Sequence, residues 1–324
     1  MKTLSPAAFL VFFLVFLGPQ RAQSKEIQVV YSAIAGSQAV FVVTKDAGLF
    51  KKQGLDVSLI FVQGGTNAAL TLFAGDVPLA VMAGVSAIQI DLKGGDLIFV
   101  AGLLNSSDYA LVVGPEIKTV NDLKGKKFSI SRTGDFSDFV ARQALQKLGL
   151  RPDKDVAILQ FGDQRARFAA LQKGAVQATI VNPPNVLVSK KMGLRVLASA
   201  EQLAIPAQGT AVVATKRSIQ ERPDDIRRFL KALIDGIWFY KSHPAESKNS
   251  IARYLKLQAQ DEIDDTYQYY RELLPRVPHP TEEGINNLIE IVNPGKLRLK
   301  ASDLIEKRFV AELEETGYID KLYR

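Results

Sequence analysis

The chain has 324 residues, of which 47% are hydrophobic and 23% charged, a balance typical of globular proteins with substantial cores. Its formal net charge is +7, but the cationic residues are scattered among acids. The sequence has no basic stripe with interleaved aromatics, so it does not indicate a nucleic-acid partner. Cysteine is absent, which excludes disulfides, thiolate catalysis, cysteine metal sites and a lipid-bearing cysteine after a leader.

Residues 1–24 have the features of a secretory signal peptide. Lys2 gives a positive start, residues 7–17 are an unbroken apolar run, and Ala-Gln-Ser at 22–24 has the small residues that a signal peptidase cleaves after. The run is shorter than the roughly 20 apolar residues that span a bilayer, although an uncleaved anchor is the alternative. Export without disulfides favours a bacterial periplasmic or secreted protein.

The first part of the chain alternates short apolar strands with amphipathic helices. Glycines such as Gly48 and Gly94 mark the helix ends. The pattern predicts strands at 27–31, 55–62, 79–82, 97–103 and 109–113, and helices at 38–47, 67–73 and 85–92.

A second alternating part follows the Gly-Pro pair at 114–115, and a helical part follows that. The apolar, β-branched stretch 209–215 reads as a strand returning to the first part. A helix then begins at Pro223, with acids in its first turn, and helical patterns continue to the end of the chain. The second part has predicted strands at 128–131, 159–161, 178–181 and 194–198, and helices at 136–148 and 165–172.

One strand–helix–strand unit occurs twice. Residues 57–81 and 156–180 both read as a strand, a polar or glycine turn, a helix, a glycine stop and a strand. Val156 follows Val57 by 99 residues, and Gly174 follows Gly75 by 99. Such βαβ units build parallel sheets. We therefore expect an α/β fold with two similar lobes, lobe one from 25–113 and 210–324 and lobe two from 114–209, with the C-terminal helices packed on lobe one.

The carboxyl ends of the strands are the expected binding edge, because ligands of open α/β sheets bind there. Helix N-termini at this edge would hold anionic groups, and small residues would let the backbone approach a ligand. The predicted ligand-binding residues are Ser37, Gln38, Gly65, Thr66, Gly84, Ser86, Arg132, Thr133, Asp135, Asp163 and Asn182.

Most of these residues also have a purely structural reading. Ser37 and Thr66 are suitable helix N-caps, and Gly65 and Gly84 are suitable turn glycines. Arg132 either binds a carboxylate or sulfonate in a fork geometry, points to solvent, or pairs with Asp135.

Short motifs spread over almost the whole chain after residue 24 resemble one protein family. They are AGLFKKQGLDV at 47–57, LFAGDV at 72–77, DLKGKK at 122–127, ALQKG at 170–174 with NPP at 182–184, and FVAEL at 309–313. Together they resemble the periplasmic substrate-binding proteins of ABC importers for nitrate, taurine, aliphatic sulfonates and the thiamine pyrimidine precursor.

This resemblance implies a type II periplasmic binding protein fold, a small-molecule ligand, and a membrane permease and ATPase as partners. We also expect a monomer without a cofactor. It also implies two crossovers between the lobes, expected near 112–113 and 208–210. Asp135 departs from the family pattern, which commonly has a small residue there. With Asp163 it leaves a neutral, zwitterionic or amine-bearing ligand open beside an anion.

Two other functions stay open. Relatives synthesise the thiamine pyrimidine with a histidine, a lysine-bound pyridoxal phosphate and a cysteine-rich motif. This chain has no cysteine, and its two histidines, His243 and His279, fall in the C-terminal helical part, which argues against an enzyme. A binding protein that signals to a membrane receptor is the other alternative, and the sequence does not separate it from transport.

Overall fold

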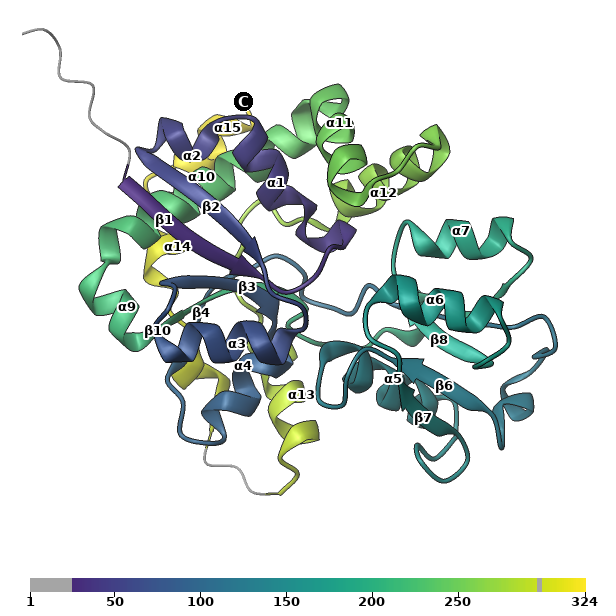
Figure 1. The fold of residues 1–324 in the computed structure, drawn as a ribbon. Coiled ribbons are helices and arrows are strands. Elements are labelled where there is room, and N and C mark those ends of the chain that lie inside the picture. The colour runs from purple at the N-terminus through teal and green to yellow at the C-terminus, as the bar shows by residue number, and fades with distance from the viewer. Residues whose placement is uncertain (1–24, 296–298) are drawn as a thin grey trace, which may run out of the picture.

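The computed structural model describes residues 25–295 and 299–324. The signal peptide predicted at 1–24 lies outside the described residues. The described chain forms two α/β lobes, each built around a mixed five-stranded sheet (Figure 1). Within these two ranges, no helix is long and apolar enough to cross a membrane.

The sheet of lobe one has the strand order β2-β1-β3-β10-β4. Strand β1 is parallel to β2 and β3, whereas β10 runs antiparallel to β3 and β4. Its strands are β1 (Lys25–Tyr31), β2 (Leu55–Phe61), β3 (Leu79–Ala83), β4 (Leu97–Gly102) and β10 (Thr210–Thr215).

The sheet of lobe two repeats this arrangement in the order β7-β6-β8-β5-β9. Strand β6 is parallel to β7 and β8, and β5 runs antiparallel to β8 and β9. Strand β8 starts 99 residues after β3, which confirms the repeat predicted from the sequence. Its strands are β5 (Ala110–Val113), β6 (Lys127–Ile130), β7 (Ala157–Gln160), β8 (Ala178–Val181) and β9 (Arg195–Ala198).

Strand β5 corrects the boundary expected between the lobes. We placed residues 109–113 at the end of lobe one, but Ala110 pairs with Val181, so the strand belongs to the second sheet. The segments that pass between the lobes are 103–109 and 204–209, and the first crossing therefore precedes β5 instead of lying at 112–113. The Gly-Pro pair at 114–115 marks the end of a strand, but it carries no information about that strand's partners.

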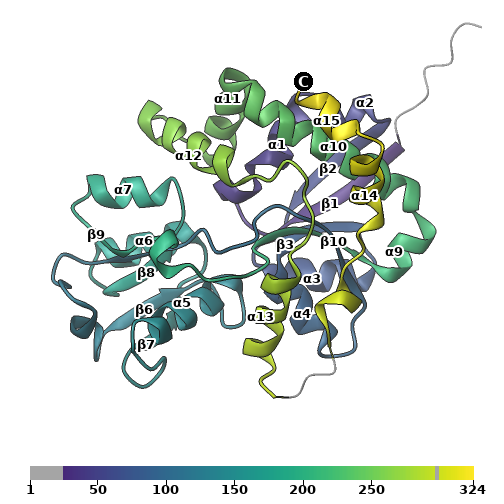
Figure 2. The same ribbon diagram turned by 180° about the vertical axis from the view of Figure 1, so that it is seen from behind.

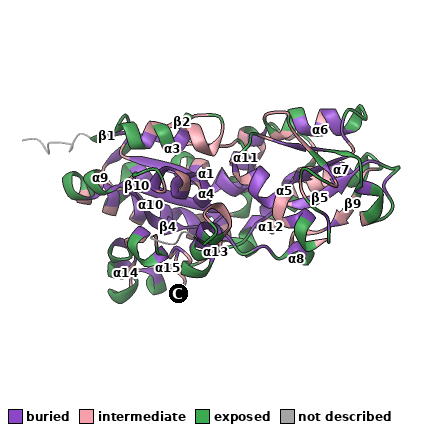
Figure 3. Ribbon diagram, turned by 90° about the horizontal axis from the view of Figure 1, so that it is seen from below, coloured by how far each residue is buried: buried purple, intermediate pink, exposed green. Residues whose placement is uncertain are grey.

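Helices cover both faces of the first sheet. Strand β1 shows why, because Ile27 and Val29 point to one core and Val30 to the other. Figure 3 shows the buried residues running through β10, β4 and α10 of this lobe. Helices α1 (Ala39–Asp46) and α10 (Pro223–Ser242) pack on one face, and α3 (Gly65–Ala74), α4 (Gly84–Asp91) and α13 (Glu282–Val292) pack on the other.

The second sheet is covered in the same way. Helix α5 extends the core that contains Val30, whereas α6 and α7 enclose a separate small core around Phe168 and Leu171. Helix α6 starts 99 residues after α3, so the two are equivalent in the repeat. The helices of this lobe are α5 (Phe136–Lys147), α6 (Gln164–Gln172), α7 (Asn185–Lys191) and the short α8 (Ala200–Leu203).

The C-terminal helices pack on lobe one, as predicted, and α10 anchors them. Phe229 of α10 stacks on Phe50 with ring centroids 5.0 Å apart. Gly236 allows the close approach of α1, because a Cβ there would lie 1.9 Å from Thr44 Oγ1. The remaining helices are α2 (Leu49–Lys52), α9 (Lys216–Glu221), α11 (Pro244–Leu255), α12 (Gln260–Leu273), α14 (Arg308–Glu315) and α15 (Tyr318–Leu322).

Helix α12 does more than cover lobe one, because it extends over the gap toward α7 of lobe two (Figure 2). Lys191 at the end of α7 forms ion pairs with Asp261 and Glu262 of α12, at 2.7 and 3.1 Å. The helical segment therefore contacts both lobes.

Asp91, at the end of α4, makes the stability of lobe one pH-dependent. Its Oδ1 accepts a hydrogen bond from the Leu97 N–H at 2.8 Å, and its Oδ2 is buried without a partner among the described residues. Burial raises the pKa of this carboxyl to about 7. In the unfolded state this carboxyl has its ordinary pKa of 3.8. Between that pH and about 7, the unfolded state therefore binds fewer protons than the folded state, so the free energy of unfolding falls as pH rises.

We expect Asp91→Asn to remove this loss. Each pKa unit corresponds to about 1.4 kcal/mol, so the variant should gain up to about 4 kcal/mol in unfolding free energy relative to wild type between pH 4 and pH 8. Urea unfolding at both pH values measures the gain, with Asp76→Asn at an exposed acid as the control. A difference between variant and wild type that is the same at both pH values would contradict the prediction.

Candidate functional site

A cavity of about 530 Å³ lies between the lobes. Lobe one contributes the loops after β1, β2 and β3, and lobe two contributes those after β6, β7 and β8. Residues 255–257, between α11 and α12, complete the wall. The carboxyl ends of parallel strands in both sheets thus face one enclosed space, as the βαβ reading of the sequence predicted.

Seven of the eleven predicted residues line this cavity and four do not. Thr66 contacts Asp135, and the Thr133 N–H donates to Gln160 Oε1 at 3.3 Å. Gly84 lies against the second crossing segment, with its N–H 2.9 Å from the Gln208 carbonyl oxygen. Asn182 is buried, with its amide turned to Asp108. The residues that line the cavity are Ser37, Gln38, Gly65, Ser86, Arg132, Asp135 and Asp163.

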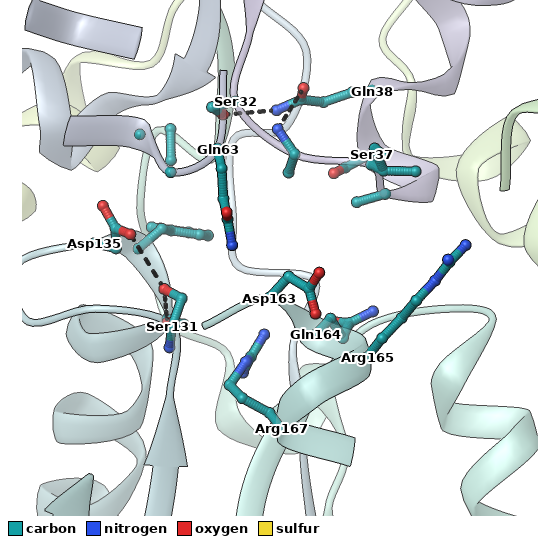
Figure 4. A pocket seen from close by; sticks show the side chains of 18 of the residues that line it. Ser32, Ser37, Gln38, Gln63, Ser131, Asp135, Asp163, Gln164, Arg165 and Arg167 are labelled. Carbon is teal, nitrogen blue, oxygen red and sulfur yellow. Dashed lines mark hydrogen bonds between the residues drawn. The ribbon is translucent and has the colours of Figure 1, made fainter. Parts of the chain in front are cut away.

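The loop after the first strand is built alike in the two lobes. In lobe one, Gln38 Nε2 donates to Ser32 Oγ at 3.1 Å, and Gln38 Oε1 accepts from the Ala33 N–H at 3.3 Å. In lobe two, the hydroxyls of Ser131 and Ser137 are bonded, each 99 residues after its counterpart. These bonds hold both loops in place, and they use part of the polar capacity of Gln38 (Figure 4).

Asp135 connects the two lobes. It precedes α5 but makes no cap bond there. Its Oδ1 instead accepts from the backbone N–H and the hydroxyl of Thr66, at 3.2 and 3.0 Å, in the first turn of α3 on the other lobe. Gly64, at φ +89°, leaves space for it, because a Cβ there would lie 3.1 Å from Asp135 Oδ2. The positive end of the α3 dipole therefore faces a carboxylate of the protein itself.

Arg132 lies beside this contact but does not pair with Asp135. Its Nη1 donates to Asn67 Oδ1 across the gap at 3.2 Å, and the side chain is exposed. The sequence left three alternatives for Arg132: binding a ligand group, pointing to solvent, or pairing with Asp135. In the structure its side chain is exposed, and its hydrogen-bond partner is the neutral Asn67. It adds a second, weaker contact between the lobes on the same side.

Arg167 is the cation that lies deepest in the cavity wall. It projects from α6, is 2% exposed, and donates through Nη1 to the Ile180 carbonyl at 2.8 Å. Its Nε has no hydrogen-bond partner, and no described carboxylate lies within ion-pair distance of it. Burial lowers the pKa of Arg167, while the neighbouring Tyr109 opposes this effect. Burial also raises the pKa of Tyr109 to about 12.

The sequence contained a signal for Arg167 that the strand-end criterion missed. Arg167, Ala170 and Leu171 have the i, i+3, i+4 spacing of one helix face, and all three are buried. An arginine on the apolar face of a helix needs a partner inside the protein or a ligand. Reading only strand ends led instead to Arg132.

Asp108, in the cavity wall, joins the crossing segment to both lobes. Its Oδ2 accepts from the Tyr270 hydroxyl of α12 at 2.7 Å and from Asn182 Nδ2 at 2.8 Å. Burial raises the pKa of Asp108, and the two hydrogen bonds act in the opposite direction. Tyr270 thus supplies a polar contact from α12 to the first crossing segment.

Apolar side chains from both lobes also line the cavity. Ile34 and Phe61 of lobe one are 45% and 41% exposed, which is high for such large hydrophobic residues. Phe136 of lobe two packs beside Tyr109, with ring centroids 5.9 Å apart. No described group of three or more His, Cys, Asp or Glu side chains could hold a metal ion.

The family described as "NMT1/THI5 like" matches residues 36–247, which is more than half of the chain. The chain belongs to the NMT1/THI5-like family. The match confirms the family resemblance inferred from the motifs.

Related sequences include several binding proteins. A Bacillus subtilis (strain 168) protein named as a candidate aliphatic sulfonates-binding protein is 28% identical over 254 residues, 73% of each chain. The candidate binding protein YtlA of the same organism is 24% identical over 69% of this chain and 66% of its own. A candidate thiamine biosynthesis protein of Haemophilus influenzae is 26% identical over 78% of this chain and 81% of its own.

Solved structures of periplasmic binding proteins share the fold. The alkanesulfonate-binding protein SsuA of Xanthomonas axonopodis pv. citri, bound to MOPS, aligns with a TM-score of 0.70 and 18% identity over 87% of this chain and 98% of its own. The periplasmic nitrate-binding protein NrtA of Synechocystis PCC 6803 aligns with a TM-score of 0.71 and 14% identity over 91% and 89%. The two-lobed periplasmic binding protein fold is thereby confirmed.

We expect Asp135→Ala to loosen the contact between the lobes. The Thr66 N–H lies in the first turn of α3, where a backbone donor has no intrahelical acceptor. Its hydrogen bond to Asp135 is therefore what protects it from exchange with solvent. A hydrogen bond to a charged group contributes about 1.5–3 kcal/mol, which corresponds to roughly 10- to 100-fold faster amide exchange at Thr66. Hydrogen–deuterium exchange resolved to α3 measures this change.

Asp163→Ala is the matched control, because Asp163 caps its own helix by accepting from the Ala166 N–H at 2.9 Å within lobe two. It should change exchange in α6 and leave Thr66 unaffected. Unchanged exchange at Thr66 in Asp135→Ala would mean that the contact between the lobes does not persist in solution.

Proposed function

We propose that this protein is the solute-binding component of an ABC-type importer, which captures a small molecule between its lobes and delivers it to a membrane permease. The observation that carries the proposal is the cavity of about 530 Å³ with walls from both lobes. A ligand there touches both lobes at once, so it stabilises their closed arrangement over an open one. Closure creates the surface that distinguishes loaded from empty protein, and two crossing segments are suited to act as its hinge.

The names of several relatives support this role. Binding proteins for alkanesulfonates and nitrate share the fold, and a Staphylococcus aureus structure described as the ligand-binding component of an ABC-type import system aligns with a TM-score of 0.73. We place the protein in the periplasm or outside the cell, reached through the predicted leader, as a monomer with a permease and an ATPase as partners. We place the ligand against Arg167 and six of the seven predicted residues that line the cavity, and we place the exposed Arg132 at its rim.

Catalysis is the less favoured function. The name of the Haemophilus influenzae relative keeps a role in thiamine biosynthesis as the alternative. Neither His243 nor His279 lines the cavity, and His279 bonds Glu314 at 2.9 Å instead. The described residues that line it include no histidine to serve as a base, and the Ser131 hydroxyl is bonded to Ser137 and Asp135 within its own loop.

A thermal-shift screen tests the binding role. The library contains sulfonates, nitrate, carboxylates, pyrimidines, flavins, amines and amino acids. A ligand present at 100 times its dissociation constant should stabilise the protein by about 2.7 kcal/mol and raise its melting temperature by several degrees. Small-angle scattering should then show a smaller radius of gyration with each hit, because the ligand holds the lobes together.

Mass spectrometry of each hit after incubation with the protein separates binding from catalysis. Recovery of the unchanged compound agrees with a binding protein, whereas steady conversion would establish an enzyme. Lys124→Ala, a change at an exposed residue remote from the cavity, serves as the control and should respond to every hit as wild type does.

A further inference from the structure

Arg167 is a buried cation that forms no ion pair with any described carboxylate. Its side chain is 2% exposed, one neutral carbonyl accepts from Nη1, and Nε has no partner. Charged side chains are seldom buried to this extent without a counter-ion, because removing the charge from water costs several kcal/mol. In Figure 4 its guanidinium points from α6 toward the gap between the lobes, where Gln63 and Asp163 also lie.

No acid of the cavity forms an ion pair with Arg167, although the nearby Asp163 and Asp135 favour its charged form. Asp135 is bonded to Thr66 and Ser131, and Asp108 is bonded to Tyr270 and Asn182. Asp163 caps α6 through the Ala166 N–H. These three carboxylates bond elsewhere, and none lies within ion-pair distance of Arg167.

The charges around the cavity suit a ligand with one negative charge. Three acids line it, together with the four cations Arg132, Arg165, Arg167 and Lys256, so four positive charges face three negative ones. All of these cations except Arg167 are exposed, and water screens them. A second negative charge on the ligand would therefore meet carboxylates without an available buried cation.

The apolar part of the wall indicates an organic ligand. Ile34 and Phe61 line the cavity and are 45% and 41% exposed, and Val188, Leu255 and Leu257 line it as well. Covering apolar surface stabilises a complex, because it removes that surface from water. An inorganic anion would reach Arg167 but leave this surface uncovered.

We propose that the cavity binds an organic monoanion, whose carboxylate or sulfonate group pairs with Arg167 and whose apolar body lies against Ile34, Phe61 and Leu257. The inference rests on the proposed function and deepens it. The Arg167 guanidinium donates to the head group from Nε, in the fork geometry that suits planar and tetrahedral oxyanions. Tyr109, which lines the cavity beside Arg167, helps to orient the guanidinium. Arg132, the cation favoured by the sequence, is then a rim residue with little effect on affinity.

Isothermal titration of the purified protein with matched probes tests the proposal. The monoanions are benzoate, 4-phenylbutyrate, benzenesulfonate and hexanesulfonate, and the neutral counterparts are the corresponding amides and sulfonamides. Phthalate represents a dianion and nitrate an inorganic anion. We expect at least one monoanion to bind about 30-fold or more tightly than its neutral counterpart, because loss of one partner of a buried charge pair costs at least about 2 kcal/mol. The carboxylate and sulfonate series separate the two head groups.

Arg167→Gln should reduce this 30-fold preference to near unity, and Arg132→Gln should leave it unchanged. Arg167→Lys, which keeps the charge but loses the fork, should retain part of the preference, and it replaces Arg167→Gln if that variant does not fold. An unchanged preference in both Arg167 variants would overturn the proposal, as would loss of the preference in Arg132→Gln.

The outcomes for the ligand class differ from those for the binding role. Equal binding of amides and monoanions, with compaction of the lobes, would overturn the anion proposal while supporting a solute-binding protein. Tighter binding of phthalate or nitrate than of every organic monoanion would also overturn it. If no monoanion binds, the proposal is wrong, and the separate thermal-shift screen then decides whether the binding role is wrong as well.

Discussion

The two segments that pass between the lobes are hydrogen-bonded to each other, and the geometry of the rest of the molecule depends on this pairing. The Gly209 N–H donates to the Leu104 carbonyl at 2.7 Å, and the Ser107 N–H donates to the Ile205 carbonyl at 3.1 Å. Because they are paired, the two segments form one connection instead of two independent linkers. They hold the carboxyl edges of the two sheets facing each other across a single cavity.

The polar groups of the cavity divide into those that hold the protein together and those that remain for a ligand. Asp135, Asp108 and Asp163 accept hydrogen bonds from other parts of the chain, and each of these bonds fixes a lobe, a hinge or a helix. Arg167 differs because its burial is not matched by a partner of opposite charge. An unpaired buried charge is less stable than a paired one, so Arg167 is the cavity side chain that gains most from an anionic ligand.

The C-terminal helices couple this site to the arrangement of the lobes. Helix α12 reaches Asp108 through Tyr270 and reaches α7 through the ion pairs of Lys191. A movement of lobe two must therefore break or rearrange contacts on α12, while Asp135 and Thr66 hold the lobes at a separate contact. Contacts of this kind give open and closed arrangements distinct energies, which a ligand can then shift.

The sequence by itself determined the elements of this protein and their repetition. Hydrophobic period, glycine stops and helix-capping residues are local signals, so the strand at 79–82, the helix at 136–148 and the 99-residue offset could be predicted without tertiary information. The strand-end criterion also found Ser37, Gln38, Ser86 and Asp163 as cavity-lining residues, because the carboxyl ends of the parallel strands of a sheet lie at one edge.

Tertiary structure decided which of these groups meet. It placed β5 in the second sheet, brought Asp135 of one lobe to Thr66 of the other, and buried Arg167 while leaving Arg132 exposed. The hydrogen bonds of Asp135 and Arg132 between the lobes join residues 69 and 65 positions apart, so no local pattern encodes them. Burial and pairing are properties of the packed lobes, and only the folded chain determines which charge needs a ligand.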